Sequence, residues 1–238
     1  MNKDVIDNSY SLNIFSDASI RKRGKLYDGC YGAIAVANNK IIDEIYRISS
    51  DTTNNNSEIK GIRAAILLAI RYQYNFSNIN IFSDSQISIF GIRERFSTWK
   101  YNINDGKLYG SMNQPIKSQE VYIEIMELIN QYHLTVTFWH QKGHVENKYD
   151  SLVEAQHVFC ASNRIRDTVD LSLIRYISYY NDIVDKKSRS ILLQTDPYKM
   201  KYINPLIFYP VNYYSLLNEY NKQNLGGNPY ERIKNFTD

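Results

Sequence analysis

The stretch SLNIFSDAS, residues 11–19, decides the fold. Its apolar run over 11–16 predicts a central β-strand that ends in Asp17. The stretch NINIF, residues 78–82, repeats the pattern and leads to Asp84. Two strands that both end in an aspartate are typical of an α/β sheet that binds its ligand at the carboxyl ends of its strands.

The segments around these two strands complete an α/β pattern. Residues 31–37 and 41–48 are separated by Asn38-Asn39-Lys40, which predicts a β-hairpin. A fifth strand is expected over 134–139, and helices are expected over 57–72, 85–96, 118–132 and parts of 163–193. Three leading antiparallel strands followed by alternating strands and helices predict one mixed five-stranded sheet flanked by helices.

The composition indicates a soluble protein with one large domain. The hydrophobic fraction of 43% and the charged fraction of 22% are ordinary for a globular chain, and a net charge of +3 is too small to demonstrate a nucleic-acid partner. The two cysteines, Cys30 and Cys160, are far apart, which favours a reducing, cytoplasmic location. We expect a domain over 1–194 and a C-terminal extension over 195–238 that packs on it or docks a protein partner.

Three acidic residues are expected to meet at the sheet edge. Asp17 and Asp84 follow strands, and Glu58 lies in the first turn of the helix between them. Clustered carboxylates repel one another, so such a cluster implies bound cations or raised pKa values. Mg²⁺ prefers oxygen ligands, and two ions can activate a water, stabilise a phosphate and relieve a leaving oxygen. The acids therefore indicate a metal-dependent phosphodiesterase.

Successive segments of the chain resemble the ribonuclease H family. FSDAS (15–19), TTNNNSE (52–58) and FSDSQ (82–86) are similar to its three acidic motifs. Residues 113–132, FWHQKGH (138–144) and NRIRD (163–167) are similar to its fourth helix, its fifth strand with a histidine loop, and its final aspartate. The segments occur in the family's order over about residues 10–175, which makes the resemblance more specific than any one motif.

The resemblance implies an endonuclease that hydrolyses the RNA strand of RNA–DNA hybrids by a two-metal-ion mechanism. No membrane partner is expected, because no stretch approaches the roughly 20 apolar residues that span a bilayer. Asp17, Glu58, Asp84 and Asp167 would hold two Mg²⁺ ions, for which Mn²⁺ is an alternative. His144 would be the mobile-loop histidine that assists proton movement or product departure. The implied substrate contacts are Asn54, Asn55 and Gln86 along the minor groove, and Trp99 and Lys100 on a basic protrusion.

The segment 145–162 is longer than the family's usual link between its histidine and its final aspartate. Asp150, Glu154 and Asp170 are therefore alternatives for the fourth ligand. Asp167 is preferred because it follows Asn163 at the family's Asn-x-x-x-Asp spacing.

Three other interpretations stay open. The chain could be a related nuclease that acts on structured or duplex DNA. It could be a non-catalytic nucleic-acid-binding module, although a pure binder gains nothing from acids that repel phosphate. His140, His144, His157 and Cys160 have a spacing that could hold zinc, although structural zinc sites usually contain more cysteines.

Overall fold

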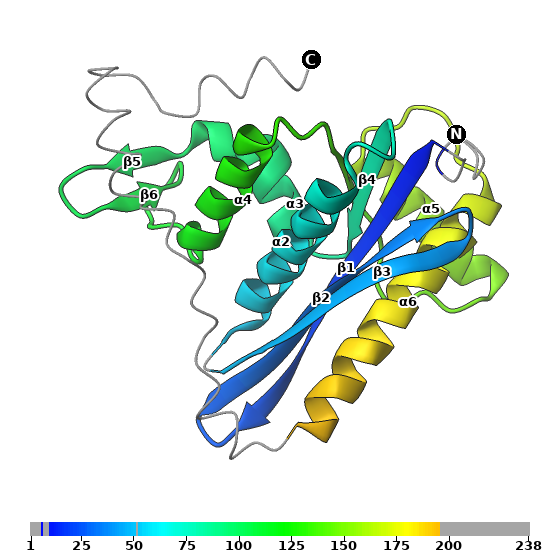
Figure 1. Ribbon diagram of the computed structural model, residues 1–238, viewed down its shortest axis with the longest axis horizontal. Helices are drawn as coiled ribbons and strands as arrows, with labels where there is room; N and C mark the ends of the chain where they lie inside the picture. Colours follow the sequence, from blue (N-terminus) through cyan, green and yellow to red (C-terminus); the bar gives the residue numbers. More distant parts are fainter. Residues whose placement is uncertain (1–5, 7–9, 51, 196–238) are drawn as a thin grey trace.

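The computed structural model describes residue 6, residues 10–50 and residues 52–195. Within this part, five strands form one sheet in the order β3-β2-β1-β4-β7 (Figure 1). Their bounds are Ser11–Arg23 (β1), Leu26–Ala37 (β2), Lys40–Ser49 (β3), Asn78–Ser83 (β4) and Thr137–His140 (β7). Strands β1, β2 and β3 are antiparallel neighbours, whereas β4 pairs parallel with both β1 and β7. The predicted mixed five-stranded sheet is confirmed.

Helices cover both faces of this sheet. In Figure 1, α2 and α4 lie on one side and α5 and α6 lie on the other. The α-helices are α2 (Asn54–Tyr72), α3 (Gln86–Phe90), α4 (Gln119–Gln131), α5 (Tyr149–Ser162) and α6 (Leu171–Gln194). Two short turns, η1 (Gly91–Arg95) and η2 (Phe96–Thr98), continue the chain after α3.

The alternation of side chains along each strand produces two separate cores. Leu12 and Ile14 on β1 pack in the core beneath α2 and α4. Phe15, the next residue, points to the opposite face and joins Phe82 in the core beneath α5 and α6. Their rings stack with centroids 4.9 Å apart. Because successive strand residues face opposite sides, both faces need apolar residues, which explains the unbroken apolar runs that predicted these strands.

Strand β1 is longer than the sequence predicts, and Asp17 lies within it rather than at its end. Its pairing with β4 stops at Ser16, which is opposite Ser83. Its pairing with β2 continues to Arg23, which is opposite Leu26. Asp17 is therefore the first β1 residue beyond the pairing with β4. Strands β1, β2 and β3 continue past it together, and residues 21–23 of β1 and 26–28 of β2 extend beyond β3 as a two-stranded ribbon.

The segment that the sequence indicates as an insertion contains a helix. Helix α5 packs on α6 and against β7, and a non-helical link over 163–170 then leads into α6. Asp170 caps the start of α6 by accepting a hydrogen bond from the Ser172 N–H at 2.7 Å. The expectations for the extension 196–238 lie outside the described residues. Within the residues that are described, no helix is long and apolar enough to cross a membrane.

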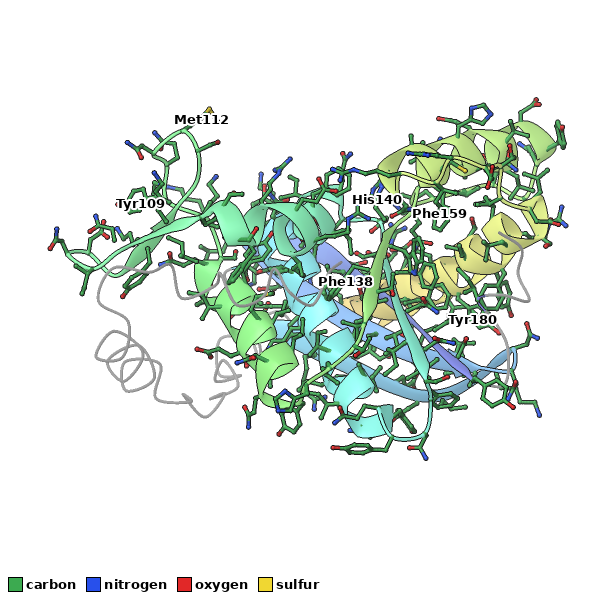
Figure 2. The ribbon with its side chains drawn as sticks, turned by 90° about the horizontal axis from the view of Figure 1, so that it is seen from above. Tyr109, Met112, Phe138, His140, Phe159 and Tyr180 are labelled. Atoms are coloured by element: carbon green, nitrogen blue, oxygen red, sulfur yellow. The ribbon has the colours of Figure 1, made fainter. Side chains whose placement is uncertain are left out.

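A small hairpin lies between η2 and α4, in the region expected to form a basic protrusion. Strands β5 (Lys100–Asn102) and β6 (Lys107–Tyr109) pair antiparallel. Figure 2 shows Tyr109 and Met112 on the side of the molecule opposite Phe159 and Tyr180. The hairpin therefore projects away from the side that α5 and α6 cover.

Candidate active site

Four acidic side chains line one pocket of about 500 Å³ at the edge of the sheet. They come from four different elements, namely Asp17 on β1, Glu58 on α2, Asp84 directly after β4, and Asp185 on α6. The fold thus brings together the first three acids that the sequence singled out. The fourth acid in the pocket is a residue that sequence analysis missed.

Asp17 is the most enclosed of these acids, with only 7% of its surface exposed. The N–H of Ala18 donates to its Oδ1 at 2.6 Å. Burial, repulsion from Asp84 and smaller repulsions from Asp185 and Glu58 together raise the pKa of Asp17 to about 9. A buried carboxyl among other carboxyls prefers its neutral form unless a cation is present.

Asp84 shares this environment and is covered by the loop that follows β7. Burial, followed by repulsion from Glu58, raises the pKa of Asp84 to about 6, whereas His144 lowers it. Gly143 passes so close that a Cβ at this position would clash with the Asp84 carboxylate. The loop can therefore approach Asp84 only because residue 143 has no side chain.

Glu58 is held by polar neighbours rather than by burial. The Ser85 hydroxyl donates to its Oε2 at 2.5 Å, and the Asn54 amide donates to its Oε1. Ser85 also caps α3 by accepting from the Ser88 N–H. These contacts connect the start of α2 to the residue after Asp84, so Glu58 and Asp84 keep a fixed relation.

Asp185 takes the position in the pocket that the sequence assigned to Asp167. Its side chain is 13% exposed, and its carboxylate lies 3.8 Å from Nδ1 of His144. The Ser19 hydroxyl donates to its Oδ1 at 3.4 Å. Repulsion from Asp185 raises the pKa of both Asp17 and Asp84, which places its charge next to theirs.

Asp167 is exposed in the link between α5 and α6 and does not line the pocket, which corrects the preferred assignment. The physical reason is that Asn163, the first residue of the pattern, binds the backbone of β7 instead of directing Asp167 toward the pocket. Its side chain exchanges hydrogen bonds with the backbone of His140, at 2.7 and 3.0 Å, and so fixes the end of α5 to β7. Asp167 follows this anchor outside any helix.

A second Asn-x-x-x-Asp pattern, Asn181 and Asp185, could have identified the fourth acid. The two residues are four apart on α6 and therefore lie on the same face of the helix. Asn181 is buried and accepts a hydrogen bond from Gln141, directly after β7, at 2.6 Å. This contact fixes the helix face that carries Asp185 toward the pocket.

The alternative fourth ligands also lie away from the pocket. Asp150 is exposed in the first turn of α5, Glu154 forms an ion pair with Lys142, and Asp170 caps α6. His144 does line the pocket, with its side chain 74% exposed and its backbone in the left-handed region at a φ of 51°. An exposed imidazole beside Asp185 can exchange protons with both the pocket and solvent.

The expected substrate contacts divide into two groups. Asn54 lines the pocket, and Asn55 and Gln86 are exposed at the starts of α2 and α3, next to Glu58 and Asp84. Lys100 is exposed on β5. Trp99 is 6% exposed and packs against Phe96 and Tyr122, so its ring lies in the apolar base of the hairpin rather than on its surface. The apolar base of the hairpin needs a large ring at this point.

The donor set of the pocket fits divalent cations. All four acids offer the oxygen ligands that Mg²⁺ prefers. The raised pKa values of Asp17 and Asp84 arise from burial and from repulsion between the acids, and bound cations would relieve that repulsion. Within the described ranges, no three His, Cys, Asp or Glu side chains stand close enough together to hold an ion as placed. His140, considered for zinc, bonds to Ser162 through Nδ1 at 2.9 Å.

Comparisons with known proteins point to one family. The RNase H family model matches residues 9–157, a range that includes Asp17, Glu58 and Asp84 and ends before Asp167 and Asp185. Ribonuclease HI of Pasteurella multocida (strain Pm70) is 28% identical over 109 residues, which are 44% of this chain and 64% of that protein. The chain thus aligns with less than two thirds of that relative's length.

Two solved structures are similar to the chain over part of its length. RNase H1 from the halophilic archaeon Halobacterium salinarum NRC-1 gives a TM-score of 0.37 at 19% identity, over 54% of this chain and 85% of that one. The PFV RNase H domain gives a TM-score of 0.48 at 16% identity, over 68% of this chain and 98% of that one. The family assignment rests on the family model rather than on these structures.

Proposed function

Because this chain belongs to the ribonuclease H family, we propose that it is an endonuclease that hydrolyses the RNA strand of RNA–DNA hybrids with divalent metal ions. The observation that carries the proposal is the convergence of Asp17, Glu58, Asp84 and Asp185 in one pocket. These acids are far apart in the sequence, and their negative charges repel one another when no cation is bound. A site that binds cations accounts for their convergence.

In this proposal the four acids hold two Mg²⁺ ions, or Mn²⁺ as an alternative. When bound, the ions supply an activated water and stabilise the charge that develops on the phosphate and on the leaving oxygen. Asp17, which is buried and central, and Asp84 are kept in place by the Ala18 N–H and by the close passage of Gly143. Glu58 is oriented by Ser85 and Asn54, and Asp185 by Ser19.

His144 is proposed to move protons at the mouth of the pocket. Its ring is exposed and lies 3.8 Å from the Asp185 carboxylate. The imidazolium can donate a proton to the departing 3′ oxygen or to the product, and it can regain that proton from solvent.

The hybrid is proposed to lie across the starts of α2 and α3. Asn54, Asn55 and Gln86 offer amide groups to the wide minor groove, where 2′-hydroxyls distinguish RNA from DNA. Lys100 and Lys107 are exposed on the hairpin and offer positive charge to the phosphates of the DNA strand.

A panel of end-labelled substrates tests this function. The panel contains an RNA–DNA hybrid, double-stranded RNA and double-stranded DNA, each incubated with Mg²⁺ and with a chelator. We expect the RNA strand of the hybrid alone to be cut, with 3′-hydroxyl and 5′-phosphate ends, and both the chelator and Asp17→Asn to abolish cutting. Cutting of duplex DNA would favour the related nuclease, and tight hybrid binding without any cutting would favour the non-catalytic module.

A further inference from the structure

The pocket that holds the four acids continues past them. Beyond Asp17 its wall is formed by the β1 residues 18–21. Beyond Asp185 its wall is formed by Arg189, Leu192 and Leu193 on α6. Both walls exist because β1 continues to Arg23 and α6 continues to Gln194. This second part of the pocket, which we call the β1–α6 groove, contains no acidic residue.

Arg189 provides the positive charge of the β1–α6 groove. It lies one helical turn after Asp185, is exposed, and makes no hydrogen bond or ion pair with the residues that the structure describes. Other cations of α6 are paired, since Lys186 binds Asp182 and Lys187 binds Glu44. A free guanidinium at the edge of a phosphodiester-cleaving site is suited to a phosphate, which it can bind with two parallel hydrogen bonds.

The two walls of the groove are fixed to each other by Arg21. Its guanidinium donates to the backbone oxygens of Leu192 at 2.7 Å and of Thr195 at 3.2 Å, at the end of α6. The same group lies 3.5 Å from Asp28, which is fully buried on β2. Carbonyls at the end of a helix lack partners within the helix, so Arg21 satisfies them and holds the helix end against the ribbon.

Apart from Arg21 and Ser19, the remaining lining of the groove is apolar. Ile20 on β1 is 37% exposed and Leu193 on α6 is 67% exposed, so both side chains offer apolar surface to the groove. A nucleotide has both features that this lining would match, namely an anionic phosphate and a less polar sugar and base. The groove is also continuous with the acids, so it would receive the strand that is cut.

We propose that the β1–α6 groove is a subsite for the RNA strand next to the cut, in which Arg189 binds one particular phosphate and Ile20 and Leu193 contact the adjoining sugar or base. This proposal rests on the proposed function, because the acids must act on the same strand. Asp185 positions the cut, and Arg189 positions the neighbouring nucleotide.

Hybrids that carry one neutral methylphosphonate linkage test the subsite. The linkage is placed in turn at each position on both sides of a single cut site in the RNA strand, and kcat/KM is measured for wild type, Arg189→Ala and Lys186→Ala. Lys186 is the matched control, since it is an exposed cation on the same helix that does not line the pocket. Thermal melting verifies that each variant is folded.

We expect one linkage position to lower the kcat/KM of wild type about tenfold, the scale of one lost charged hydrogen bond. Arg189→Ala should show about the same loss on the unmodified hybrid and no further loss at that position, whereas Lys186→Ala should behave like wild type. Equal sensitivity of wild type and Arg189→Ala at every position would overturn the subsite. So would the same loss in Lys186→Ala. A wild-type protein that cuts no hybrid would instead overturn the proposed function, and the subsite with it.

Discussion

Asp17 occupies an environment that favours its protonated form. Burial and three neighbouring acids raise its pKa to about 9, and only the Ala18 N–H lowers it. Ionisation of Asp17 therefore costs folding free energy in the absence of cations. The cluster of acids that makes ionisation of Asp17 unfavourable also favours metal binding, because a bound cation would offset the repulsion between the carboxylates.

Metal-free wild type should lose stability as the pH rises. The pKa of Asp17 in the folded state, about 9, lies above its ordinary value of 3.8, so the folded state binds more protons between these values. Asp17→Asn removes this effect. In a chelator, the variant should melt above wild type at about pH 8, and the difference should shrink toward about pH 4. Equal melting temperatures at all pH values would contradict the electrostatic account.

Sequence analysis identified three of the four acids in the pocket, because each follows or starts a clearly patterned element. The fourth could not be chosen by spacing alone, since Asn163–Asp167 and Asn181–Asp185 share the same pattern. The two are distinguished by what each asparagine contacts. Asn163 anchors α5 to β7, whereas Asn181 fixes the face of α6 that carries Asp185.

At the scale of elements, the contact of Arg21 with the end of α6 determines how the second wall of the pocket is held. Arg21→Ala should lower the free energy of unfolding by about 1–3 kcal/mol, because it removes charged hydrogen bonds and leaves Asp28 with fewer partners. Urea denaturation measures the change. Arg175→Ala, which removes an exposed cation of α6 that donates to Asn147 in the loop before α5, is the control and should change stability by less than about 1 kcal/mol.

The β5–β6 hairpin depends on Trp99 for its attachment to the domain. Trp99→Ala should cost about 3–5 kcal/mol in the free energy of unfolding, and Trp99→Phe should cost less, since Phe refills most of the space. Because the ring is buried, Trp99→Phe should bind a hybrid as wild type does. A large loss of hybrid affinity in a stably folded Trp99→Phe protein would instead assign the ring to substrate contact.

Elements with strong periodicity were predictable, and those without it were not. The alternation of Leu12, Ile14 and Phe15 between two cores explains why β1 could be recognised. Its continuation to Arg23 depends on pairing with β2 and on the contact with α6, which the charged sequence beyond Asp17 does not indicate. Strands β5 and β6 have three residues each, too few to produce a pattern.

At the scale of the whole molecule, the pocket is assembled from distant parts of the described chain. Asp17 comes from its first strand and Asp185 from its last helix, with α5 and its link placed between His144 and α6. The family match ends at residue 157, before α6 begins. The catalytic domain that we propose therefore has to extend through α6.

A chain that ends at Pro197 should retain the cleavage activity, because all four acids and the Arg21 contacts lie before that point. The measurement compares kcat/KM on the hybrid for this shortened chain and for the full chain. If the two kcat/KM values agree within about threefold, they differ by less than about 1 kcal/mol in activation free energy, and the proposed domain boundary is supported. A loss of cutting by a folded shortened chain would show that the C-terminal extension takes part in the reaction.

The most direct test of the proposed site compares Asp185→Asn with Asp167→Asn in hybrid cleavage with Mg²⁺. If Asp185 is the fourth acid, its variant should lose about 100- to 1,000-fold in kcat, the scale expected for the loss of one electrostatic contribution to the active site. Asp167→Asn, exposed in the link before α6, should cut as wild type does. Full activity of Asp185→Asn together with an inactive but folded Asp167→Asn would contradict the account.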